Sequence, residues 1–132
     1  MNEVLQFLKE CGYYFLATED GSQARVRPFG TAEIFEGHLY IQTGKAKNVY
    51  KQISKNPNVE ICAYNPTSGK WIIICGNLIA DERVEAKKHM LDNYPSLRGM
   101  YDEHDDNTIV LYFEKGEATF SSFVEAPRTI KF

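Results

Sequence analysis

Two arginines followed by a proline form the most chemically informative segment of the sequence. Arg25 and Arg27 stand two positions apart, so on a β-strand their side chains point to the same face. Two guanidinium groups on one face are costly to bury unless an anion or a group rich in acceptors meets them. Pro28 cannot donate a hydrogen bond to a neighbouring strand, which predicts a sheet edge or a bulge with backbone groups free for a ligand. The alternative is a solvated strand face with incidental charges.

A second segment, residues 43–51, places a threonine, a glycine, three lysines and an asparagine at the start of a predicted helix. The free amide groups and the dipole at a helix N-terminus attract phosphate, and lysines supply compensating charge. Lys47 and Lys51 are one helical turn apart and repel each other unless an anion or a carboxylate lies nearby. The segment lacks the spacing of a P-loop. We therefore predict a phosphate site of another kind, with an ordinary solvated helix face as the alternative.

Other residues that could do chemistry carry weaker signals. Trp71, the only tryptophan, suits either a core or interface position or the wall of a site for a flat cofactor. The three histidines lack metal-ligand spacing, so no metal site is expected. The three cysteines form no CxxC pair, and we expect reduced, buried thiols rather than a disulfide framework.

Composition is that of one ordinary globular domain spanning residues 1–132. A net charge of −3 argues against a nucleic-acid binder, and aromatic residues at 13% favour β structure or a planar ligand. The N-terminal residues do not resemble a signal peptide, and no apolar run approaches the length of a membrane helix. We therefore expect a cytoplasmic protein with no membrane partner.

The periodicity of the chain predicts the elements that position these segments. Helical patterns cover residues 2–11, 46–55 and 81–94, and a polar surface excursion follows at 95–107. Strand patterns cover 13–18, 23–33, 34–35, 38–43, 59–64, 70–80, 108–113 and 117–123, mostly joined as hairpins. This pattern predicts a mainly β domain, a Greek-key-like barrel of six to seven antiparallel strands with a few helices.

Taken together and in this order, the segments resemble the pyridoxamine 5'-phosphate oxidase-like FMN-binding split barrels, most closely their small nitroimidazole-reductase-like branch. The resemblance covers nearly the whole chain. Its motifs are residues 15–18 with 20–21, 25–29, 39–43, 47–48 with 51, 56–60, and Trp71 with 76–78.

The resemblance implies a split β-barrel that binds FMN as its cofactor. Arg25, Val26, Arg27, Pro28 and Phe29 would lie along the isoalloxazine. Gln42 would also contact the cofactor, and Thr43, Lys47, Asn48 and Lys51 would hold the ribityl phosphate, with either Lys45 or Lys47 as the first lysine. The family forms homodimers with shared sites, which implies that Trp71, Phe120 and Ser121 come from the partner subunit.

The function implied is that of an FMN-dependent oxidoreductase acting on a small molecule such as a nitroaromatic, a quinone or a B6-like compound. Two alternatives belong to other classes. One is a non-catalytic carrier of flavin or haem, and the other is an unoccupied barrel that serves as an interaction protein.

Overall fold

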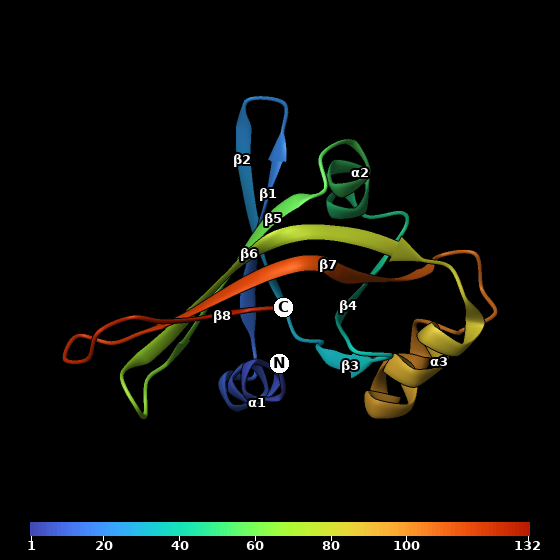
Figure 1. Cartoon of the computed structure of the whole chain (residues 1–132). Helices are drawn as coiled ribbons and strands as arrows, with labels where there is room; N and C mark the ends of the chain where they lie inside the picture. Colours follow the sequence, from blue (N-terminus) through green and yellow to red (C-terminus); the bar gives the residue numbers. More distant parts are fainter.

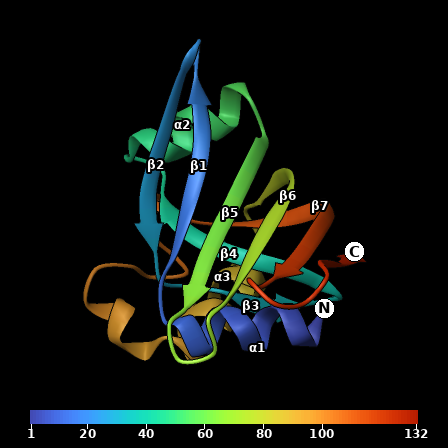
Figure 2. The same ribbon diagram turned by 90° about the vertical axis from the view of Figure 1, so that its left-hand side faces the viewer.

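A strongly curved antiparallel sheet forms the frame of the protein (Figures 1 and 2), as seen in a computed structural model that describes residues 1–132. Its strand order is β2-β1-β5-β6-β7-β4-β3, and β8 pairs with β7 on a separate branch. The elements in chain order are α1 (Asn2–Cys11), β1 (Tyr14–Asp20), β2 (Gln23–Phe29), β3 (Glu33–Phe35), β4 (His38–Gly44), α2 (Asn48–Lys55), β5 (Asn58–Asn65), β6 (Lys70–Asp81), α3 (Val84–Asn93), the 3-10 helix η1 (Pro95–Gly99), β7 (Thr108–Ser121) and β8 (Arg128–Lys131). The predicted mainly β split barrel is confirmed.

The edge position predicted from Pro28 is also confirmed, because β2 ends the sheet and pairs only with β1. Pro28 lies opposite Phe15 in this ladder. The other edge of β2 has no strand partner, so its backbone groups remain available beside the tip of the hairpin.

One main core holds the barrel together. Alternate residues of the strands point inward, among them Leu16, Ile61 and Ile74, all fully buried. Two helices pack on this core through residues one turn apart: α1 through Val4 and Leu8, and α2 through Val49 and Ile53. On α2 this anchoring leaves Lys51, Ser54 and Lys55 exposed to solvent.

A smaller core lies between α3 and the outer face of the sheet. Tyr40 and Val110 of the sheet meet Ala86 and Met90 of α3 there. Figure 1 shows α3 and η1 on the side of the barrel away from the β1–β2 hairpin. No helix of the structure combines the length and apolar character needed to cross a membrane.

Two predicted strands, residues 108–113 and 117–123, are instead one continuous strand, β7. The predicted turn around Gly116 is absent because Gly116 pairs with Gly76 of β6 and exchanges backbone hydrogen bonds with Phe132, at 2.6 and 2.8 Å. A register shift between Asn77 and Leu78 of β6 absorbs the irregularity. The C-terminal residues add β8, so eight strands replace the six to seven expected.

The expectation of buried thiols was wrong for two cysteines. All three cysteines are free, but Cys62 and Cys75 are exposed and Cys11 is half-buried. Cys62 and Cys75 occupy the outward-pointing positions of β5 and β6, where the alternation of the strand turns them away from the core.

Candidate functional site

A basic groove lies between the β1–β2 hairpin and α2, with a volume of about 940 Å³. Figures 1 and 2 show the hairpin standing beside α2. Five basic and two acidic side chains line the groove: Arg25, Arg27, Lys47, Lys51 and Lys55, with Glu19 and Asp20. The groove is therefore positively charged although the whole chain carries −3. Both chemically informative segments of the sequence meet in it.

The start of α2 contributes amides and lysines to this groove. Lys47 is the N-cap residue, its side chain makes no capping hydrogen bond, and the first turn of α2 contains no acidic residue. Lys47 and Lys51 line the groove, and neither has a carboxylate partner within ion-pair distance. Asn48 lines the groove next to them. Uncapped amides and unpaired ammonium groups form a donor set suited to phosphate.

The structure distinguishes Lys45 from Lys47. Lys45 donates a hydrogen bond of 2.7 Å from Nζ to Oε2 of Glu82, and it does not line the groove. That hydrogen bond also raises the pKa of Lys45. Lys47 is thus the lysine of this loop that is placed to meet a phosphate.

Arg25 and Arg27 share a face of β2, as their spacing predicts, but their side chains make different contacts. Arg27 donates from Nη1 to Oγ1 of Thr18 at 2.8 Å and from Nη2 to Oε1 of Gln52 at 2.7 Å. The bond to Thr18 lies within the β1–β2 hairpin, and the bond to Gln52 ties the hairpin to α2 across the groove. Burial and the neighbouring charge of Arg25 lower the pKa of Arg27.

Arg25 is the freer of the two guanidinium groups. Its side chain is half-exposed, and its one ion pair is a long contact of 3.6 Å with Asp20. Arg25 can therefore turn toward a ligand in the groove without breaking the contacts that hold α2 in place.

Three other predicted cofactor contacts, Phe29, Gln42 and Thr43, have buried side chains. Phe29 packs in the main core against Tyr14, with 5.9 Å between ring centroids. The amide nitrogen and oxygen of the Gln42 side chain are buried and lack hydrogen-bond partners within the chain. None of the three lines the basic groove.

Of the remaining predicted residues, only Val26 lies at the groove. Val26 lines the groove, but it points to the outward face of β2, as does Pro28. Trp71 pairs with Ser121 at the far end of β6 and β7, the end that lies at the lower left in Figure 1. Phe120 and Ser121 line a separate hollow of about 370 Å³ beside α1. Within one chain, these three residues do not reach the basic groove.

Several residues that line the groove or support its walls were not singled out from the sequence. Lys55 follows Lys51 by one helical turn, so the helical period could have found it. Gln52 and Thr18 gave no such signal, because their roles depend on a contact between α2 and β1. The Oγ1 of Thr18 lies 2.6 Å from Oε1 of Gln52.

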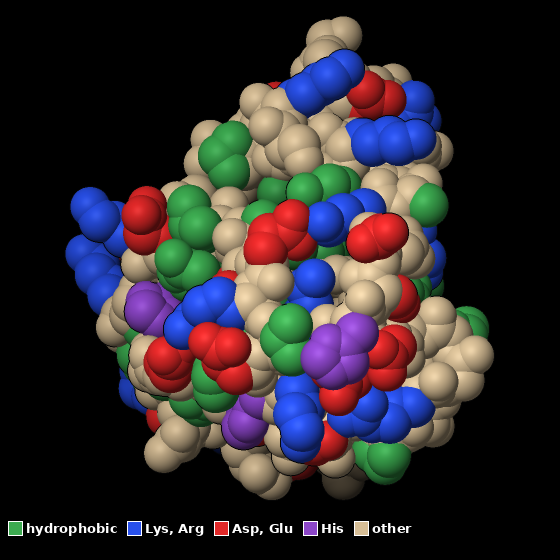
Figure 3. Space-filling view, turned by 90° about the vertical axis from the view of Figure 1, so that its right-hand side faces the viewer, with side chains coloured by type: hydrophobic (Ala, Val, Ile, Leu, Met, Phe, Trp, Pro, Cys, Tyr) green, Lys and Arg blue, Asp and Glu red, His purple; other side chains and the backbone are tan.

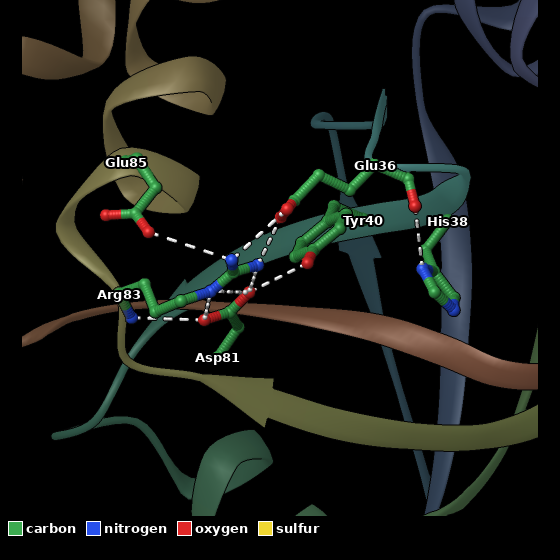
Figure 4. A network of polar contacts seen from close by, with 6 residues as sticks. All are labelled: Glu36, His38, Tyr40, Asp81, Arg83 and Glu85. Carbon is green, nitrogen blue, oxygen red and sulfur yellow. Dashed lines mark hydrogen bonds and ion pairs between the residues drawn. The ribbon is translucent and has the colours of Figure 1, made fainter.

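A second polar cluster surrounds Arg83 at the start of α3 (Figure 4). Asp81, whose side chain is 6% exposed, accepts a hydrogen bond of 2.7 Å from the hydroxyl of Tyr40 and contacts Nη2 of Arg83 at 2.9 Å. Arg83 also pairs with Glu36 at 2.6 Å. Burial raises the pKa of Asp81, but the hydrogen bonds from Arg83 and Tyr40 outweigh it and lower the pKa overall. On this side of the molecule acidic and basic side chains are interspersed (Figure 3).

Comparison with known proteins decides the family. The model of the family described as pyridoxamine 5'-phosphate oxidase like matches residues 1–120. The chain belongs to this family. A search of the curated proteins found none that matches.

Solved structures of other proteins resemble this pyridoxamine 5'-phosphate oxidase-like chain. A NimC/NimA family protein from Clostridium acetobutylicum is 45% identical, with a TM-score of 0.96 and coverage of 100% of this chain and 92% of that one. A pyridoxamine 5'-phosphate oxidase-related, FMN-binding protein from Nostoc punctiforme has a TM-score of 0.65 at 13% identity, covering 98% and 92%. A haem-binding protein from Mycobacterium smegmatis has a TM-score of 0.68 at 10% identity, covering 93% and 57%. The last two likenesses show the fold alone.

Proposed function

We propose that this protein binds FMN in the basic groove and works as an FMN-dependent oxidoreductase on a small molecule such as a nitroaromatic, a quinone or a B6-like compound. The observation that carries the proposal is the pair of unmatched lysines, Lys47 and Lys51, at the uncapped start of α2. The matching family and the FMN-binding protein of the same fold support the choice of cofactor.

The donor set of the groove fits FMN. Lys47, Asn48 and Lys51 would hold the phosphate, since charge-assisted hydrogen bonds are the strong ones. Arg25 and the free edge of β2 would meet the polar edge of the ring system, with backbone donors and acceptors on a rigid strand. FMN, when bound, supplies the two-electron redox chemistry. The positive charge of Arg25 would stabilise negative charge that develops nearby.

The proposal includes a homodimer in which each site draws on both subunits. Trp71 and Ser121 lie at the end of the sheet away from the groove, so they can take part only from a second copy. The outward face of the sheet offers a surface for that copy, because Phe15, Val26 and Tyr64 are all more than half exposed on it. Contiguous exposed apolar side chains mark interaction surfaces. The free cysteines suit a reducing compartment, in agreement with the cytoplasm.

Haem is the second candidate ligand, favoured by the haem-binding protein of the same fold. An axial haem ligand is most often a histidine. None of the three histidines lines the basic groove. His89, on α3, is hydrogen-bonded through Nε2 to the carbonyl oxygen of Ile34 at 3.0 Å. This distribution favours FMN over haem as the ligand of the groove.

The test is to mix the purified protein with FMN, separate it by gel filtration with light-scattering detection, and record the absorbance of the eluted peak. The proposal expects the visible bands of oxidised flavin to co-elute with a species of twice the chain mass. Bleaching of these bands by NADH or NADPH, and their return when an acceptor is added, would identify an enzyme; a stable flavin spectrum would identify a carrier. A colourless peak would contradict FMN binding, and a coloured monomer would contradict the shared site.

A further inference from the structure

One residue of a distant segment, Asn107, makes two hydrogen bonds to the backbone of the loop between β4 and α2, residues 44–47. The backbone N–H of Lys45 donates to the carbonyl oxygen of Asn107 at 2.7 Å. The next backbone N–H, that of Ala46, donates to Oδ1 of the same asparagine at 2.9 Å. Asn107 therefore fixes two successive peptide groups immediately before Lys47, the N-cap of α2.

Asn107 is itself held firmly. Its N–H donates to Oδ1 of Asp105 at 3.0 Å, and the same oxygen accepts from the N–H of Thr108 at 2.6 Å. Burial raises the pKa of Asp105, but these backbone hydrogen bonds outweigh it and lower the pKa overall. The acidic segment that the sequence predicted as a surface excursion is thus a hydrogen-bonded support at the start of β7.

The packing against Gly44 shows how closely the two segments fit. A Cβ atom added to Gly44 would lie 2.7 Å from Nδ2 of Asn107 and 3.2 Å from Cε1 of Tyr101. The backbone of Gly44 does not lie in the left-handed region, so this close approach is what favours glycine here.

We propose that Asn107 is a positioning residue for the phosphate subsite, an inference that rests on the proposed function. The α2 helix has only eight residues and no side-chain cap, so contacts outside the helix must fix its first turn. Asn107 supplies such a contact to the backbone just before the helix, and it does not line the groove itself. It acts by preorganising Lys47, Asn48 and the first amides of α2, which lowers the cost of ordering them around a phosphate.

The experiment compares two ligands that differ only in the phosphate. Dissociation constants of FMN and riboflavin are measured by flavin fluorescence for the unmodified protein, for Asn107→Ala, and for the control Asn93→Ala. Asn93 is an exposed asparagine of α3 whose amide donates to the carbonyl of His89. In Asn107→Ala we expect FMN affinity to fall about tenfold and riboflavin affinity to stay within about twofold, since only the phosphate contacts lose preorganisation. The control should change neither.

Two further measurements keep the inference testable if Asn107→Ala folds poorly. Gly44→Ala pushes against the same asparagine from the other side and should give the same selective loss. Amide hydrogen exchange of the protein without ligand should be faster at Ala46 in Asn107→Ala, because this variant loses the Oδ1 acceptor of the Ala46 N–H, while β7 stays protected.

The outcomes separate this inference from the proposed function. Equal affinity of the unmodified protein for FMN and riboflavin would overturn both, because no phosphate site would then exist. A preference for FMN that survives Asn107→Ala, or a parallel loss of both ligands, would overturn the positioning role alone.

Discussion

The basic groove and the Arg83 cluster both gather charged side chains on the same small barrel, but they treat charge differently. In the Arg83 cluster each charge meets a partner, because Arg83 pairs with Asp81 and Glu36 and the Tyr40 hydroxyl satisfies Asp81 further. In the groove, Lys47 and Lys51 stand one turn apart on α2 with no carboxylate partner. A folding chain gains nothing from leaving two such charges together.

This difference is the physical basis for our proposal that the Arg83 cluster stabilises the fold and the groove binds a ligand. Matched, partly buried charges at the β6–α3 junction hold α3 against the sheet. Unmatched charges beside an uncapped helix are stabilised only when an anion arrives. The same principle separates Arg27, which is bonded to Thr18 and Gln52, from the freer Arg25.

The largest effect is expected from removing the unmatched charges. In Lys47→Ala with Lys51→Ala, FMN affinity should fall about tenfold or more, because charge-assisted phosphate contacts are each worth roughly 1.5–3 kcal/mol. Flavin titration measures the affinity, and urea unfolding should show stability unchanged or slightly increased. Unchanged FMN affinity in a folded variant would contradict the assignment of the phosphate site to this groove.

The matched cluster should respond in the opposite way. Asp81→Asn removes the charge that Arg83 and Tyr40 share, so the free energy of unfolding should fall by about 1–3 kcal/mol. FMN affinity should stay within about twofold, because distant sites act independently. Urea denaturation and flavin titration of the same preparation measure both. A large loss of FMN affinity without loss of stability would contradict the assignment of Asp81 to the stability of the fold alone.

Acid unfolding of the unmodified protein and of Asp81→Asn tests the charge of Asp81 separately. Since the folded state lowers the pKa of Asp81, the stabilisation is complete above the ordinary aspartate pKa of about 3.9 and is lost as the pH falls through the lower folded value. Stability should therefore fall less steeply below about pH 4 in Asp81→Asn than in the unmodified protein. Identical acid unfolding curves for the two proteins would show that this carboxylate contributes no charge-dependent stability.

The smallest effect is expected from the third lysine of the loop. Lys45 is matched by Glu82 and lies outside the groove, so Lys45→Ala should change FMN affinity by less than about threefold. The paired measurement is Lys47→Ala alone. If Lys45→Ala weakens FMN more than Lys47→Ala does, the assignment of the two lysines must be reversed.

The sequence predicted those parts of the fold whose signals are local. Pro28 marked the edge strand, the spacing of Val49 and Ile53 marked α2, and the Asp20-Gly21 turn marked the first hairpin. The continuity of β7 was missed, because Gly116 looks like a turn residue until the pairing with Gly76 and Phe132 is known.

The candidate site was also predicted only where its signals are local. The arginine and lysine segments could be found from residue types, and the fold brings them together. The structural duty of Arg27, the pairing of Lys45 with Glu82 and the support by Asn107 could not be found, because each depends on residues at least nine positions away in sequence. The burial of Gln42 likewise depends on tertiary packing around β4, which pairs with β7, rather than on its neighbours in the chain.

The most direct test of the central claim is a crystal structure of the protein grown with FMN. The account predicts the phosphate within hydrogen-bond distance of Lys47, Lys51 and the first amides of α2, with the ring against β2 and a second subunit closing the site. A flavin bound elsewhere, or one whose phosphate points into solvent away from α2, would contradict it.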